Sequence, residues 1–168
     1  MRTGALLLAA LATLACGSGD RDRRAAEEAV RAYDEALVRA FRASDRQGMR
    51  GTATEKEANR VLVLIDLKIA DRLVLESTLE RLDLLSADRV GPDGYTVRTQ
   101  ERWRYHDRPL DPGRTTGPEL VAEMKMEYEV AREGGRWLVA KARTLSSEYL
   151  EPPGFKPGAP RGSAATAH

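Results

Sequence analysis

The chain has 168 residues, enough for one domain with short appendages, and a formal net charge of +1. Only one of its 27 basic residues, Arg2, precedes Cys16, so a chain that begins at Cys16 has equal numbers of basic and acidic side chains. This neutrality argues against electrostatic docking on nucleic acid or acidic lipid, and a single cysteine excludes an internal disulfide and a thiolate metal cluster.

Residues 1–15 have the pattern of a secretory signal peptide, with a cationic start and an apolar run shorter than the ~20 residues that span a bilayer. The lone cysteine, Cys16, followed by Gly17, resembles the cleavage site of a bacterial lipoprotein signal, in which the cysteine is lipidated and becomes the new N-terminus. That resemblance implies an anchor at Cys16 in the cell envelope, on the periplasmic side of the outer membrane in a Gram-negative cell. The alternative is ordinary cleavage after Ala15, which releases a soluble periplasmic or secreted protein.

Residues 16–24 are polar and without pattern, which predicts a tether that carries the lipidation cysteine and holds a domain of residues 25–150 near the membrane. Residues 25–43 repeat apolar side chains at helical spacing and predict a first helix. Its buried stripe contains Ala26, Val30, Tyr33, Leu37 and Phe41.

A second helix is expected to start at Thr52 or Thr54, since each has a glutamate three residues later that completes a capping box. Its inner part, residues 61–69, is apolar almost all round, which indicates a helix covered on more than one side.

Residues 73–90 are ambiguous, because their leucines suit either a helical stripe or the first arm of a hairpin. We assign a strand from about Leu79, with a start at Leu75 as the alternative. Residues 90–94 then contain the proline and glycines of a turn. The strand that follows, residues 95–106, alternates almost perfectly between two faces, which is typical of a half-buried strand.

Two further strands complete the predicted sheet. Residues 107–118 are rich in proline and glycine and predict a loop. A strand with Met124 and Met126 on one face follows, and a glycine turn leads to the last strand, residues 136–145. Residues 151–168 have no core-forming pattern and predict a disordered tail.

Two N-terminal helices followed by about four antiparallel strands indicate an α+β fold with the helices on one face of a curved sheet. The strand from Thr99 to Tyr105 (TQERWRY), followed by Gly135-Arg136-Trp137, resembles the nuclear-transport-factor-2-like superfamily. Within it, the similarity is to the IMS-like domain first described in a chloroplast-division protein. The resemblance covers about residues 25–145 and implies a sheet wrapped round the helices into an open cone.

Glu101 is the candidate catalytic residue, because it lies on the Trp103 face and some members of the superfamily, ketosteroid isomerase among them, have a carboxylate in the cone. A general base needs a partner acid or an oxyanion donor in the same cavity. The tyrosines suited to that role by type are Tyr33, Tyr105 and Tyr128. The spacing assembles no such set, so we predict no catalytic residue.

A structural Glu101 is the preferred interpretation. An unpaired buried carboxylate is too costly, so it must be hydrogen-bonded or paired. The candidate partners are Lys141 and Arg143 on the last strand and Lys68 on the second helix. A pocket in the cone would be lined by Glu101, Trp103, Met124 and Met126.

The two histidines, His106 beside the proline-rich loop and His168 in the tail, provide no metal site, and no cofactor is expected. The arginines of the central strand alternate with its aromatic residues and so lie on the opposite face, which prevents a stacking platform flanked by cations. Cross-strand pairing with glutamates of the next strand accounts for these arginines, so no nucleic-acid partner is expected.

Three functions stay open. The first, which we favour, is a membrane-anchored extracytoplasmic interaction or scaffold lipoprotein without catalysis, whose protein partner is unknown. The second is a carrier for a small apolar ligand, which an open pocket favours. The third is an isomerase- or dehydratase-type enzyme with Glu101 as base, which a pocket that joins Glu101 to a tyrosine hydroxyl favours. A filled cone favours the first.

Overall fold

The computed structural model describes residues 16–150, with side chains from Gly19 onward. Two helices precede four strands, which confirms the α+β prediction of two helices on a curved four-stranded antiparallel sheet. The predicted signal peptide and the predicted tail lie outside the described residues. The elements are α1 (Cys16–Ala43), α2 (Glu55–Ala70), β1 (Leu73–Arg89), β2 (Gly94–Pro109), β3 (Leu120–Glu133) and β4 (Arg136–Leu150).

Helix α1 buries one stripe, because apolar residues recur every three or four positions along it. Ala26, Val30 and Tyr33 are at most 2% exposed. The helix begins at Cys16, so residues 17–24, predicted as a patternless tether, form its first turns and advance only ~1.5 Å each.

Helix α2 begins after Thr54, one of the two expected starts, but the Thr54 side chain makes no capping hydrogen bond. The backbone here joins the edge of the sheet instead: Thr54 N donates to Val139 O at 2.9 Å, and Val139 N donates to Thr52 O at 3.0 Å. The helix buries a single stripe. Val63 and Leu67 are 59% and 58% exposed, so the expectation of a helix covered on more than one side is wrong.

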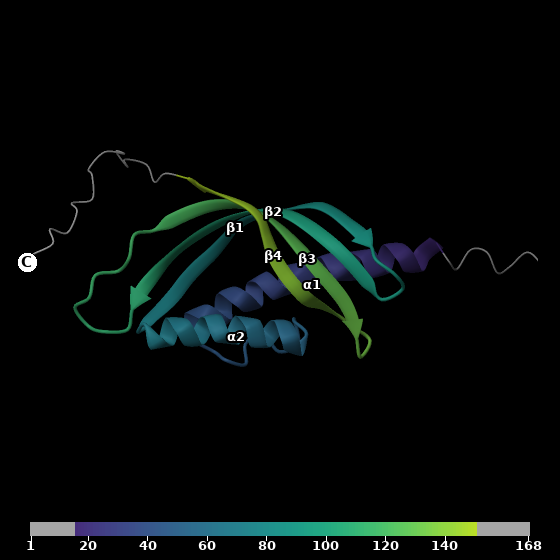
Figure 1. The fold of residues 1–168 in the computed structure, drawn as a ribbon. Coiled ribbons are helices and arrows are strands. Elements are labelled where there is room, and N and C mark those ends of the chain that lie inside the picture. The colour runs from purple at the N-terminus through teal and green to yellow at the C-terminus, as the bar shows by residue number, and fades with distance from the viewer. Residues whose placement is uncertain (1–15, 151–168) are drawn as a thin grey trace, which may run out of the picture.

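The strands form an antiparallel meander in the order β1-β2-β3-β4, and Figure 1 shows them arching over the two helices. β1 begins at Leu73, earlier than expected, so the helical alternative for residues 73–90 does not hold. Register shifts interrupt the pairing of β1 with β2 and of β3 with β4. An extra residue at such a bulge bends its strand, which explains the curvature of the sheet.

One end of the arch is filled with side chains. Val97, Val130 and Val139 come from three neighbouring strands, are at most 2% exposed, and form one cluster with Ala26 and Val30 of α1. The other end, towards the start of β3, contains a cavity.

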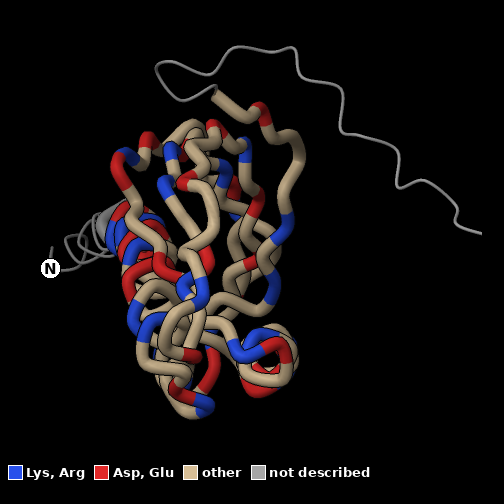
Figure 2. Tube along the Cα trace, turned by 90° about the vertical axis from the view of Figure 1, so that its left-hand side faces the viewer, with Lys and Arg blue, Asp and Glu red and all other residues tan. Residues whose placement is uncertain are grey.

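The outer face of the sheet carries ion pairs between strands. Arg98 binds Glu127 at 2.9 Å, as expected from the alternation, and Arg104 binds Glu80 at 2.6 Å. Figure 2 shows basic and acidic residues intermixed along the chain. Exposed pairs contribute ~1 kcal/mol or less each, so the stability of the domain comes mainly from the concave side.

Candidate functional site

The unfilled end of the arch contains a cavity of about 590 Å³, to which all six elements contribute side chains. Small-molecule sites occupy ~300–1,000 Å³ and are mostly apolar, so this cavity has the size of a ligand site. The apolar lining residues include Leu37, Phe41, Leu64, Leu75, Met124 and Met126.

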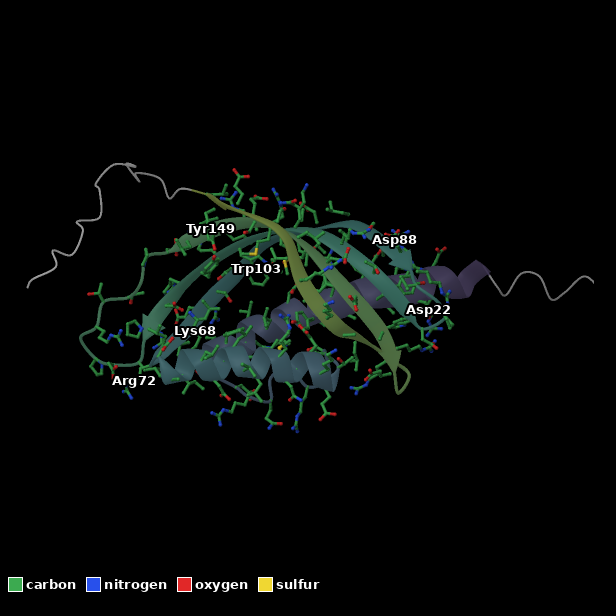
Figure 3. All side chains as sticks on the ribbon, viewed as in Figure 1. Asp22, Lys68, Arg72, Asp88, Trp103 and Tyr149 are labelled. Atoms are coloured by element: carbon green, nitrogen blue, oxygen red, sulfur yellow. The ribbon has the colours of Figure 1, made fainter. Side chains whose placement is uncertain are left out.

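The structure brings together in this wall all four residues that the sequence suggested for a pocket, Glu101, Trp103, Met124 and Met126. Strands β2 and β3 pair with Glu101 opposite Met124 and with Thr99 opposite Met126. Alternate residues of both strands therefore lie on the concave face. Figure 3 shows Trp103 under the arch of the sheet.

Glu101 is completely buried, and hydrogen-bond donors meet both of its oxygens. Thr99 Oγ1 and Tyr128 Oη donate to Oε1, the latter at 2.8 Å, and Trp103 Nε1 donates to Oε2 at 2.7 Å. Both oxygens of this carboxylate are therefore already engaged within the core. The arrangement makes Glu101 the centre of a polar cluster within the core.

The expected cationic partner of Glu101 is absent from the described side chains around it, so that prediction is wrong. Each of the three candidates binds another carboxylate: Lys141 pairs with Glu129, Arg143 with Glu127 and Lys68 with Asp107. For the two candidates on β4, Lys141 and Arg143, the reason is a bulge, where Val139 pairs with Val130 and Lys141 with the adjacent Glu129, leaving Ala140 as an extra residue. A single extra residue reverses which side chains face inward.

Asp34 of α1 is a second buried carboxyl beside Glu101. Its side chain is 1% exposed, and its Oδ1 lies 3.1 Å from Tyr128 Oη. Its Oδ2 is buried and has no hydrogen-bond partner among the described residues. Burial, followed by the negative charge of Glu101, raises the pKa of Asp34 well above its usual range, so its protonated form persists to higher pH than that of an exposed aspartate.

Sequence reasoning missed Asp34, although a signal was present. Asp34 lies four residues after Val30 and three before Leu37, so helical spacing puts it on the buried side of α1. A charged residue type on an otherwise apolar helix face indicates a buried polar partner elsewhere. The partner itself, Tyr128, is far along the chain and could not be identified from spacing.

A further polar cluster joins the two helices to β4. Tyr33 Oη donates to Glu57 Oε1 at 2.7 Å, and Arg60 Nε donates to Glu57 Oε2 at 2.8 Å. Arg60 also donates from Nη2 to Ala142 O at 3.0 Å. Burial, followed by the hydrogen bond to Glu57, raises the pKa of Tyr33 above its usual range. The Tyr33 hydroxyl therefore stays protonated and acts as a structural donor.

His106 does not belong to the cavity wall, and its Nε2 lies 3.3 Å from Glu76 Oε2. His168 lies outside the described residues. Within residues 16–150, no three His, Cys, Asp or Glu side chains are grouped so that they could hold a metal ion. Neither described helix has both the length and the hydropathy required to cross a bilayer.

No protein-family model and no curated protein matches the chain. Among solved structures, it is similar to the intermembrane-space region of the chloroplast protein ARC6, with 16% identity, 74% of this chain and 96% of that chain covered, and a TM-score of 0.66.

Two other similar structures carry enzyme names. A ketosteroid isomerase-like protein from Erwinia carotovora atroseptica is 13% identical, with 79% of this chain and 99% of that chain covered and a TM-score of 0.51. The hexachlorocyclohexane dehydrochlorinase LinA-type3 from Novosphingobium barchaimii is 14% identical, with 83% of this chain and 99% of that chain covered and a TM-score of 0.53. At these identities the similarity concerns the fold alone, which this chain shares with the three structures, and says nothing about activity.

Proposed function

We propose that this domain binds a small, uncharged and mainly apolar molecule in the cavity under the sheet and performs no chemistry on it. The observation that supports this is the cavity of about 590 Å³ with its largely apolar wall. Three cationic side chains also reach the wall, Arg60, Lys68 and Arg143, but each binds a carboxylate. An anionic ligand therefore gains little from them.

This proposal departs from the sequence-based preference for an interaction module, because that function was expected to go with a filled cone. The enzyme alternative required a free base near a tyrosine hydroxyl. Glu101 does lie 2.8 Å from Tyr128 Oη, but both of its oxygens already accept hydrogen bonds within the core. The geometry therefore favours binding over proton transfer.

We further propose that the domain acts in the cell envelope, attached by a lipid at Cys16. The support is the apolar run of residues 1–15 that ends at the only cysteine of the chain. Residues 17–24 belong to α1, so an anchored domain would be held close to the membrane, where apolar molecules concentrate.

The test measures binding of diphenylmethane, a hydrocarbon without polar groups, by titration calorimetry. Met126→Trp places a large ring in the cavity wall, and Lys125→Trp places the same ring on the neighbouring exposed residue of β3 as a matched control. We expect saturable binding to the wild type and to Lys125→Trp, and weaker binding by at least ~10-fold to Met126→Trp. Equal or absent binding in all three proteins would contradict the proposal.

A further inference from the structure

Asp34, a residue of the cavity wall, has a buried side-chain oxygen whose hydrogen-bonding capacity is unused among the described residues. Of the buried side-chain atoms that the structure describes, Asp34 Oδ2 and Arg102 Nε make no hydrogen bond. Arg102 Nε lies 3.0 Å from Glu80 Oε2 in an ion pair, and only Asp34 belongs to the cavity wall. A buried polar atom without a partner is costly, because it has lost its hydrogen bonds to water and gained none. Such an atom at a ligand cavity is a natural contact for a polar group of the ligand.

Counting hydrogens identifies what kind of atom Oδ2 is. Tyr128 Oη has one hydrogen and two carboxyl neighbours, Glu101 Oε1 at 2.8 Å and Asp34 Oδ1 at 3.1 Å. The charged and nearer Glu101 is the stronger acceptor, so it receives that hydrogen. The Tyr128 oxygen can then accept the hydrogen of a protonated Asp34 from Oδ1, whereas an ionised Asp34 carries no hydrogen at all.

In either form, Oδ1 is the oxygen in contact with Tyr128 Oη at 3.1 Å, and Oδ2 is left as an oxygen without a hydrogen. Such an oxygen only accepts hydrogen bonds. The Tyr128 hydroxyl thus links Asp34 to Glu101, and Thr99 and Trp103 complete the set of donors to Glu101. The raised pKa of Asp34, caused by burial and by the charge of Glu101, agrees with this assignment.

We propose that Asp34 Oδ2 accepts a hydrogen bond from a hydroxyl group of the ligand, so that the cavity selects uncharged, mainly apolar alcohols. This inference rests on the proposed function and names the chemical class of its ligand. A ketone or ether of the same shape presents only acceptor oxygens to an acceptor and is disfavoured.

The contact requires a small movement of the wall, because Oδ2 is itself inaccessible to solvent. Met124 and Met126 line the same cavity and are only partly buried. Methionine side chains have three rotatable bonds and adapt easily to a new neighbour. A slender hydroxyl group therefore needs less rearrangement than a bulkier donor such as an amide.

Three probes with the same carbon frame test the inference: diphenylmethane, benzhydrol and benzophenone. They present to the protein no polar group, a hydroxyl group and a carbonyl oxygen, respectively. Dissociation constants are measured for the wild type, Asp34→Ala and Asp34→Asn. The preference for benzhydrol over diphenylmethane is compared between proteins, so that the cost of dehydrating the hydroxyl cancels.

We expect this preference to be ~10-fold larger in the wild type than in Asp34→Ala, the effect of one hydrogen bond in a dry site. Asp34→Asn should keep it, because the amide donates to Tyr128 Oη through its nitrogen and retains an oxygen for the ligand. Benzophenone should bind no more tightly than diphenylmethane to any of the three proteins.

Two outcomes would overturn the inference: tighter binding of benzophenone instead of benzhydrol relative to diphenylmethane, or an equal preference for benzhydrol in the wild type and Asp34→Ala. In either case, binding of diphenylmethane leaves the proposed function standing. If none of the probes binds, both fail. Should Asp34→Ala not fold, wild type and Asp34→Asn are compared after dividing each affinity by the probe's partition from water into cyclohexane. The corrected affinity of benzhydrol must then exceed the corrected affinity of benzophenone. The reverse order overturns the inference.

Discussion

Replacing Asp34 by asparagine should stabilise the domain at neutral pH, and the gain should grow with pH. In the unfolded chain an aspartate ionises near pH ~3.9. In the folded protein, burial and the charge of Glu101 raise the pKa of Asp34, so the folded state retains a proton that the unfolded state releases. The stability that Asp34 contributes is thus fully present below pH ~3.9 and is lost as the pH rises towards the folded pKa.

The magnitude follows from proton linkage. Each pH unit between the two pKa values costs the wild type ~1.4 kcal/mol, whereas asparagine has no proton to lose. Urea unfolding of both proteins at pH 5, 6, 7 and 8 measures the difference directly. We expect the free energy of unfolding of Asp34→Asn to exceed that of the wild type by an amount that increases over the lower part of this range.

Glu127→Gln provides a control of opposite sign. The hydrogen bond from Arg143 is the main cause that lowers the pKa of Glu127, so its stabilising effect is present above the unfolded pKa and lost as the pH falls. This variant should be less stable than the wild type at neutral pH, with a loss that fades on acidification. If wild type and Asp34→Asn differ by a constant amount from pH 5 to 8, the pKa of Asp34 is not raised in the way that its surroundings indicate.

Three further outcomes are expected. If Cys16 is lipidated, Cys16→Ser should move the protein from the membrane fraction to the soluble fraction, and equal soluble amounts would contradict lipidation. Trp103→Ala should cost ~3–5 kcal/mol by urea unfolding, and Trp137→Ala less, because Trp103 is 8% exposed and Trp137 is only partly buried. Gly48→Ala should cost ~1–3 kcal/mol, because its new Cβ would lie 2.7 Å from Ala40 Cβ, and an unchanged melting temperature would show that the loop yields.

The side of β2 that faces the cavity was predictable because its signal is local. Alternation from Tyr95 to His106 assigns Glu101 and Trp103 to one face without any knowledge of the neighbouring strands. Residues 73–90 were harder, since their helix-forming leucines carry no local sign of the hydrogen bonds that β2 supplies. Pairing across the hairpin outweighs the intrinsic preference of the segment.

The polar cluster could be predicted only in part, because it depends on bulges and on distant partners. The parity of Lys141 with Trp137 indicated an inward side chain, but the extra residue Ala140 turns Lys141 outward to Glu129. Nothing in the composition of β4 marks that bulge. The helix face of Asp34 was readable from its spacing, whereas its contact with a tyrosine on β3 exists only in the folded chain.

The position of Glu101 leads to a last prediction, about stability. Truncation in Glu101→Ala removes the acceptor for Thr99 Oγ1, Trp103 Nε1 and Tyr128 Oη at once, and buried donors without acceptors are costly. We expect a loss of ~3–5 kcal/mol in the free energy of unfolding, the range for breaking a buried polar set by removing one member. Glu129→Ala, at an exposed ion pair of the same sheet, should cost no more than ~1 kcal/mol.

Glu101→Gln separates the charge of this residue from its shape. Its amide oxygen can still accept from Trp103, a strict donor, but its NH₂ group must face two hydroxyl groups that donate to Glu101 in the wild type. Those hydroxyls can turn, so the loss should be smaller than for alanine, and Tyr128 becomes free to donate to Asp34. The pKa of Asp34 should then fall, because the neighbouring charge that raises it is gone. If Glu101→Ala instead leaves stability unchanged, Glu101 is not the structural centre of the cluster, and a catalytic role for its carboxylate becomes the better explanation.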